Sequence, residues 1–319
     1  MKKLGTAFAA ALTVATALSA SLAGMAGAEA KELKTLGISV GSLGNPFFVA
    51  IIKGAEAQAK EINPDVKVTA VSSDYDLNKQ FTQIDNFIAA GVDMILLNAV
   101  DPVAIEPAVK KAQAAGIVVS AFDVSAKGAD DTVMTNNIQA GELACQYIVD
   151  HIGGKGNVVI ANGPQVSSVI DRVKGCEAVF AKHPDIKVLS SNQDAKGSRD
   201  GGFAVGQGLL TRFPDIQGVF AINDPTAIGF ELAAKQLGRK EFIITAVDGA
   251  PDIEAVLKTG NSLIKASASQ DPYLMAQRAV AIGNEILQGK KPAETTVLME
   301  PKLITSENVG EYKGWTAAR

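Results

Sequence analysis

A regular alternation of short β-rich runs with longer amphipathic segments constrains the fold most. Amphipathic segments such as 46–62 and 102–116 separate these runs. Strands that alternate with helices of this length indicate βαβ units with right-handed crossovers, and nearly continuous apolar strands are typical of parallel sheets covered on both faces. The sequence therefore predicts an α/β protein, with strands at 33–40, 66–71, 93–98, 116–122, 131–135, 157–162, 186–191, 218–223, 242–247 and 263–269.

The number of predicted strands favours two sheets. The chain has 319 residues, a length that suits about two domains. A break near 135–141 divides the strands into two sets, and 267–273 is a plausible return crossing. We expect two doubly wound parallel-sheet lobes, with a ligand cleft between the carboxyl ends of their strands.

The first thirty residues have the pattern of a secretory signal peptide. Lys2 and Lys3 precede a long apolar run that ends in small residues. Cleavage after Ala30 would leave Lys31 as the first mature residue, and cleavage after Ala28 is the alternative. A lipid anchor is not expected, because Met25 stands where a lipoprotein would carry cysteine.

The two cysteines and the net charge limit the chemistry. In an exported protein, Cys145 and Cys176 can form a disulfide; the alternative is two small buried thiols. His151 and His183 add no metal-ligand spacing, so no metal is expected. The formal charge of −4 gives no reason to expect nucleic acid as a partner.

Polar and aromatic residues lie where the predicted strands end or the following helices begin, which is where the cleft should lie. Each alone has a plainer explanation: Asp and Asn often cap helices, Arg172 could pair with Asp171, and Phe47 and Phe48 could form a hydrophobic staple. As a set they suit a sugar, because rings cover its CH faces while carboxylates, amides and a guanidinium bond its hydroxyls. The set comprises Asn45, Phe47, Phe48, Asp123, Arg172, Asn223, Asp248 and Gln270.

The mature chain resembles the periplasmic sugar-binding proteins of the ribose-binding type, the substrate receptors of ABC importers. The resemblance is carried by "GNPFF", "GVFAINDPTAIG" and "VDGAPD" in this order after a signal peptide. It implies a type I periplasmic binding fold with a three-strand hinge, crossing near 135–137, 268–271 and 298–301. The lobes would comprise 31–136 plus 271–299 and 137–270 plus 300–319. It also implies that the eight residues above contact a monosaccharide or polyol.

The same resemblance implies a periplasmic monomer that serves a membrane ABC permease, with no cofactor and no catalysis. The chain departs from the ribose-binding pattern at three positions. Val124 replaces an arginine, Gly41 replaces a polar residue, and Gly197 stands where the second lobe would supply an aromatic ring. Ribose is therefore not assumed, and another aldose, a deoxy sugar or a linear polyol fits as well. Gly41, Val124, Asn137 and Arg199 are secondary candidates for the site.

Three other functions compete with sugar import. A transcriptional repressor with this fold would carry a basic DNA-binding segment where this chain has its export signal. A glycosidase would need a carboxylate pair, for which Asp123 and Asp248 are the candidates, but the resemblance argues against it. A receptor for a small signalling ligand, such as autoinducer-2 or a chemotaxis attractant, would share the architecture.

Overall fold

The first of two sheets contains six parallel strands. The computed structural model describes residues 31–316, so the predicted signal peptide lies outside the described residues. The strand order is β11-β5-β4-β3-β1-β2. The strands are β1 (Thr35–Val40), β2 (Lys67–Ser72), β3 (Met94–Leu97), β4 (Val118–Phe122), β5 (Asp131–Thr135) and β11 (Thr296–Met299).

The second sheet repeats this order with one antiparallel edge. Its order is β12-β10-β9-β8-β6-β7, and only the β10–β12 pair within the described residues is antiparallel. The strands are β6 (Gly156–Asn162), β7 (Ile186–Asp194), β8 (Gly218–Ala221), β9 (Ile243–Asp248), β10 (Ile264–Ser269) and β12 (Leu303–Thr305). Strands β11 and β12 were absent from the ten predicted strands, because β11 has only four residues and β12 only three.

Helices cover both faces of each sheet. In the first lobe, called the N-lobe, α1 (Pro46–Ile62) packs on α9 (Pro272–Leu287), and α2 (Leu77–Ala90) packs on α3 (Glu106–Ala114). In the second lobe, the C-lobe, the helices are α4 (Asn137–His151), α5 (Ser167–Phe180), α6 (Arg199–Arg212), α7 (Asp224–Gln236) and α8 (Pro251–Thr259). Helix α3 is shorter than the predicted segment 102–116, because the Asp101 carboxylate accepts the Val103 and Ala104 N–H groups and holds a turn there.

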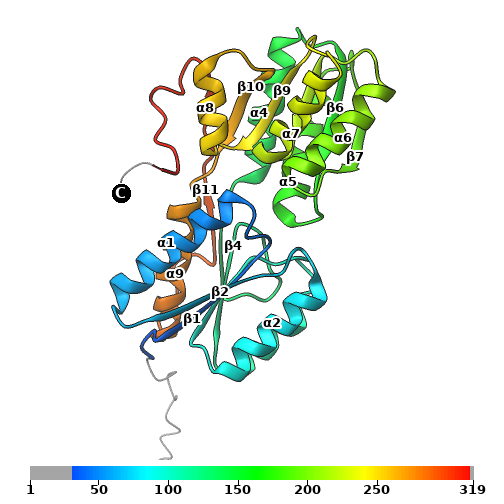
Figure 1. Ribbon diagram of the computed structural model, residues 1–319. Helices are drawn as coiled ribbons and strands as arrows, with labels where there is room; N and C mark the ends of the chain where they lie inside the picture. The colour runs from blue at the N-terminus through cyan, green and yellow to red at the C-terminus, as the bar shows by residue number, and fades with distance from the viewer. Residues whose placement is uncertain (1–30, 317–319) are drawn as a thin grey trace, which may run out of the picture.

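The chain passes between the sheets three times, after β5, after β10 and after β11. Figure 1 shows the two lobes stacked end to end, with these connections at the waist between them. Two α/β lobes joined by three crossings are the predicted fold class.

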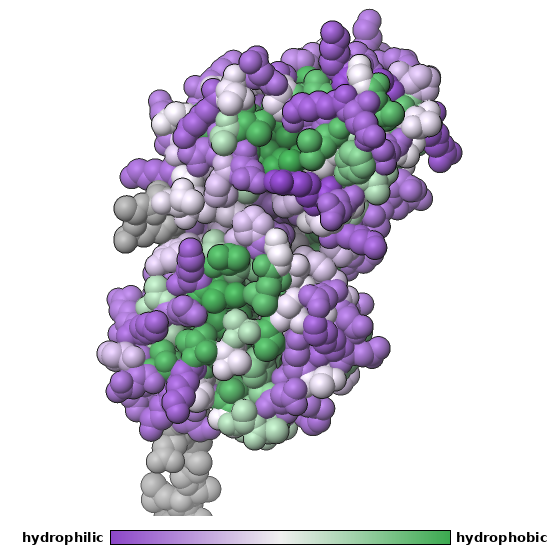
Figure 2. All heavy atoms as spheres, viewed as in Figure 1, coloured by the Kyte–Doolittle hydropathy of each residue, from purple (hydrophilic) through white to green (hydrophobic). Residues whose placement is uncertain are grey.

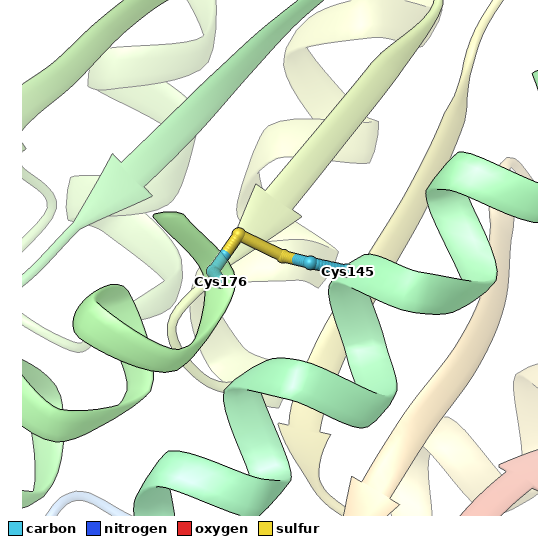
Figure 3. The surroundings of a disulfide bond; sticks show 2 residues. All are labelled: Cys145 and Cys176. Carbon is cyan, nitrogen blue, oxygen red and sulfur yellow. A yellow bond between two sulfur atoms is a disulfide. The ribbon is translucent and has the colours of Figure 1, made fainter. Parts of the chain in front are cut away.

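Helices α4 and α5 of the C-lobe approach each other unusually closely. A Cβ atom at Gly141 would lie 2.0 Å from the carbonyl oxygen of Arg172, and one at Gly175 would lie 2.1 Å from that of Ile138. Glycine is therefore required at both positions. The contact brings Cys145 and Cys176 to a Cα–Cα distance of 5.1 Å, and they form the predicted disulfide (Figure 3).

The surface of the lobes is mixed in character. Figure 2 shows hydrophilic residues along the outer margins of both lobes and apolar patches toward the middle of each. Within residues 31–316, no helix is long and apolar enough to span a membrane.

Candidate functional site

A cavity between the lobes brings together all eight primary candidates from the sequence. It encloses about 430 Å³ of space, counting its open mouth. Asn45, Phe47, Phe48, Tyr75, Asn98 and Asp123 line it from the N-lobe. Gln270 lies at a crossing, and the C-lobe contributes Pro164, Val166, Ser168, Val169, Arg172, Gly197, Ile222, Asn223 and Asp248.

The start of α1 places two rings on the cavity. The Asn45 side chain caps the helix by accepting the Phe47 N–H at 3.0 Å, and Pro46 occupies the first helical position. The Phe47 and Phe48 rings lie edge to face with centroids 5.3 Å apart. Both side chains are buried and both line the cavity, so the adjacent rings serve the core and the site together.

The two carboxylates of the site follow β4 and end β9 in unusual backbone conformations. Asp123 has a φ of 64° and Asp248 a φ of 139°, both in the region that favours glycine. Asn98 donates to the Asp123 carboxylate at 2.9 Å. Such conformations cost free energy and gather at ligand sites, where the surrounding fold holds them in place.

Arg172 is the buried cation of the site. It lies in the second turn of α5 rather than at the helix start where the sequence placed it. Its Nη1 atom lies 3.5 Å from the Asp248 carboxylate, and the two side chains are 5% and 3% exposed. The guanidinium therefore does not pair with Asp171 in the way that the plainer explanation required.

A closed ring of polar contacts joins the site to two of the crossings. The Gln270 amide donates to Asp248 at 2.8 Å and accepts from the Thr135 hydroxyl at 2.7 Å. Arg172 donates through Nε to Asn137 at 2.9 Å, and the Asn137 amide donates to the Thr135 carbonyl at 2.9 Å. The ring links Thr135, the last residue of β5, and Gln270, which follows β10, to the charged pair, so site and hinge share one network.

Asn223 is both a helix cap and a cavity residue. Its side-chain oxygen accepts the Thr226 N–H at 3.0 Å at the start of α7, and its amide donates to the Gly197 carbonyl at 3.0 Å. The capping explanation is therefore correct for Asn223, and the residue also lines the cavity.

Burial dominates the electrostatics of the acids. It raises the pKa of Asp123 to about 6 and that of Asp248 to about 6, although Arg172 opposes both shifts. Neighbouring Asp224 is fully buried, with its carboxylate accepting from Ser267 at 2.6 Å and from the Ala250 N–H at 2.7 Å. Burial, together with the nearby Asp248 charge, raises the pKa of Asp224 well above its usual range.

The four secondary candidates do not line the cavity. Val124 is buried in the same apolar cluster as Val166, and Gly41 lies beneath the Tyr75 ring. Asn137 accepts a hydrogen bond from Arg172 and so helps to position the guanidinium. Arg199 lies at the outer mouth of the cleft and pairs with Asp252 on the surface at 2.7 Å.

Sequence reasoning missed two polar residues of the N-lobe wall. Asn98 directly follows β3, and it was hidden inside the predicted strand 93–98. Tyr75 lies three residues beyond β2, in a turn that no local pattern marked. The strand-end position was the signal available for Asn98. The aliphatic C-lobe wall of Val166, Val169 and Ile222 carried no signal of its own.

The C-terminal segment packs against residues that form or adjoin the site. Trp315 packs its ring on Phe47 with centroids 5.8 Å apart and donates its indole N–H to the Gln270 carbonyl at 3.0 Å. Tyr312 donates its hydroxyl to the Gly249 carbonyl at 2.9 Å. The segment thus contacts the C-lobe, one crossing and a cavity ring of the N-lobe.

Two lobes that enclose a polar, ring-lined cavity beside a hinge define a solute receptor of the periplasmic binding type. The family described as periplasmic binding protein domain matches residues 36–291. The chain belongs to this family, whose members are periplasmic solute receptors and not enzymes. This membership decides against the glycosidase alternative.

Individual relatives cover most of the chain. A ribose import binding protein of Bacillus subtilis is 36% identical over 269 residues, which span 83% of this chain and 85% of the relative. A xylitol-binding protein of Mycolicibacterium smegmatis is 31% identical over 311 residues, spanning 96% and 86%. A periplasmic solute-binding protein of an ABC transporter from Actinobacillus succinogenes, solved with bound D-allose, aligns with a TM-score of 0.79 at 27% identity, covering 88% of this chain and all of that structure.

Proposed function

We propose that this chain is the receptor of an ABC importer, which binds a monosaccharide or polyol between its lobes and delivers it to the membrane permease. One observation carries the proposal: two carboxylates, a guanidinium, amides and aromatic rings converge in one small interlobe cavity. The names of the relatives, which bind ribose, xylitol and D-allose, support the same ligand class.

Each side chain has a role that follows from its chemistry. The rings of Phe47 and Phe48 cover the CH face of the ligand. Asp123 and Asp248 accept hydrogen bonds from hydroxyls, and Arg172 donates to ring or hydroxyl oxygens. Asn45, Asn223 and Gln270 complete the polar lining. In a buried cavity such bonds are strong, and leaving one unmade is costly.

Binding is coupled to closure of the lobes. The ligand touches both lobes only when they are closed, so it favours the closed state by the difference in its affinity for the two states. An interlobe bond from the Ser125 N–H to the Ser167 hydroxyl at 2.7 Å lies beside the cavity and is one contact that closure would make. The closed form then presents surfaces from both lobes to the permease.

The remaining parts of the proposal concern processing and assembly. Residues 1–30 direct export and are removed, which leaves an unlipidated chain starting at Lys31. The receptor acts as a monomer in the periplasm. Mass spectrometry of the exported protein tests the cleavage site, and light scattering tests the assembly.

Calorimetric titration tests the ligand class. The chain from Lys31 onward is stripped of ligand by unfolding and refolding with its disulfide intact, and is titrated with D-ribose, D-allose, xylitol and erythritol. We expect saturable binding at micromolar or lower Kd, which corresponds to about −8 kcal/mol. If none of the four compounds binds, the result would contradict the proposal and favour a signalling ligand.

A further inference from the structure

The aromatic lining of the cavity is one-sided. Among the lining residues within 31–316, the three rings of Phe47, Phe48 and Tyr75 all belong to the N-lobe. The opposite wall is aliphatic and polar, and Gly197 offers no side chain at all. A ligand held here can therefore stack on rings from one lobe only.

Tyr75 lies at the neck of the site. It lines the inner cavity and also the outer mouth of the cleft, a wider space of about 1,320 Å³ between the lobes. Asn45 and Gly197 are the other residues that line both spaces. Tyr75 of the N-lobe and Gly197 of the C-lobe therefore both lie where the inner cavity meets the outer mouth.

Gly41 makes room for the Tyr75 ring. A Cβ atom at Gly41 would lie 2.7 Å from the ring carbon Cε1 of Tyr75 and 3.1 Å from the Asn98 side-chain oxygen. Real Cβ atoms do not approach a ring so closely, so any larger residue would displace the tyrosine. The Tyr75 N–H also donates to the Gly41 carbonyl at 3.2 Å, which fixes the turn above the glycine.

The backbone that carries Tyr75 is strained. Asp74 and Tyr75 have φ values of 52° and 56°, an uncommon pair for residues other than glycine. The Ser72 hydroxyl, which donates to Asp74 at 2.6 Å, and the Asp76 cap of α2 hold this turn. Strain of this kind persists where the fold over-determines a conformation, and it is common at ligand sites.

The Tyr75 phenol is a hydrogen-bond donor at neutral pH. Burial raises its pKa above the ordinary value, and the neighbouring Asp123 and Asp248 carboxylates raise it further. The hydroxyl therefore stays protonated at neutral pH and keeps its O–H donor.

We propose that Tyr75, seated on Gly41, is a specificity-determining residue that covers the ligand at the neck and restricts the site to polyhydroxy compounds of four or five carbons. This inference rests on the proposed function, because it presupposes a polyhydroxy ligand. The ring supplies apolar cover opposite Gly197, and its bulk excludes the sixth carbon of a hexose.

Calorimetry on five proteins tests the inference, using erythritol, xylitol, D-ribose and D-allose as probes. Tyr75→Asn removes the ring, and asparagine can adopt the positive φ of this position. Tyr75→Phe removes only the hydroxyl, and Gly41→Ala displaces the ring without changing it. Tyr147→Ala is the matched control, because this ring stacks on His151 outside the cavity. Thermal unfolding by circular dichroism confirms that each variant is folded.

We expect the wild type to prefer a four- or five-carbon probe over D-allose by about ten-fold or more, a discrimination typical of a pocket that excludes one carbon. Tyr75→Asn and Gly41→Ala should each weaken binding of the preferred probe and reduce its preference over D-allose to within about three-fold. Tyr75→Phe should keep the wild-type preference. Tyr147→Ala should match the wild type.

Two results would overturn the inference while leaving the proposed function intact: D-allose binding best to the wild type, or a preference over D-allose in both Tyr75→Asn and Gly41→Ala that is as large as in the wild type. If Tyr75→Asn does not fold, Gly41→Ala and Tyr75→Phe decide between the outcomes. Absence of binding by the wild type would overturn both the inference and the proposed function.

Discussion

Replacing Asp248 by asparagine should weaken ligand binding without destabilising the protein. The substitution keeps the shape of the side chain and removes its charge. Asp248 is 2% exposed, lies 3.5 Å from Arg172 and accepts from Gln270 at 2.8 Å. It therefore belongs at once to the cavity wall and to the network that reaches the hinge.

The structure sets the size and sign of both effects. A hydrogen bond to a charged group contributes about 1.5–3 kcal/mol, so losing the carboxylate should weaken binding by roughly 10- to 150-fold. The pKa of Asp248 is raised from 3.8 to about 6, which means that its charge is held in the ligand-free fold at a cost of up to about 3 kcal/mol. Asp248→Asn removes that cost, so the free energy of unfolding at pH 7.5 should stay level or rise.

Two measurements on the same samples check this prediction. Calorimetry with the tightest-binding probe gives the Kd, and urea unfolding followed by circular dichroism gives the free energy of unfolding. Asp85→Asn is the control, because Asp85 forms an exposed pair with Lys111 far from the cavity. An affinity within about two-fold of the wild type would show that Asp248 does not contribute to ligand binding. A clear loss of stability would show that the carboxylate acts through the fold instead.

Three further outcomes follow from the described contacts. The affinity for the ligand should fall as pH drops from 7.5 to 5, since Asp123 and Asp248 gain protons near pH 6. The ligand-free protein should gain stability over the same range, because the folded state binds those protons more tightly than the unfolded state does. A pH series of calorimetric titrations and thermal melts measures both effects. Asp131→Asn should stabilise the protein at pH 8 but not below pH 4, because burial raises the pKa of Asp131 to about 7, as urea unfolding at the two pH values would show. Reducing the Cys145–Cys176 bond, which closes a loop of 31-residue separation, should lower the free energy of unfolding by about 3–4 kcal/mol, measured with and without dithiothreitol.

The position of the site could be predicted because of a property of parallel sheets. The carboxyl ends of the strands meet at one edge, so polar residues just after strands were expected to converge. Asp123, Asp248 and Gln270 satisfied this rule, and all three lie on one cavity. The β-rich runs also placed ten of the twelve described strands, since these runs alternate with helical segments along the chain.

The remaining residues depended on geometry that a sequence pattern does not express. Tyr75 reaches the cavity only through two consecutive positive φ values and the absence of a side chain at Gly41. Arg172 reaches Asp248 because Gly141 lets α4 and α5 lie almost in contact. Strand β11 has only four residues, so its apolar stretch is too short to stand out as a strand in the sequence.

The place of Trp315 gives the protein an optical reporter of its own. It is the one tryptophan in the sequence, and its indole lies edge to face with the cavity ring of Phe47 while donating to the carbonyl of Gln270 at a crossing. Indole emission responds to changes in the polarity and hydrogen bonding around the ring. Intrinsic fluorescence excited at the indole band can therefore follow ligand binding and lobe closure in stopped-flow experiments, without a dye, a cysteine label or any substitution in the site.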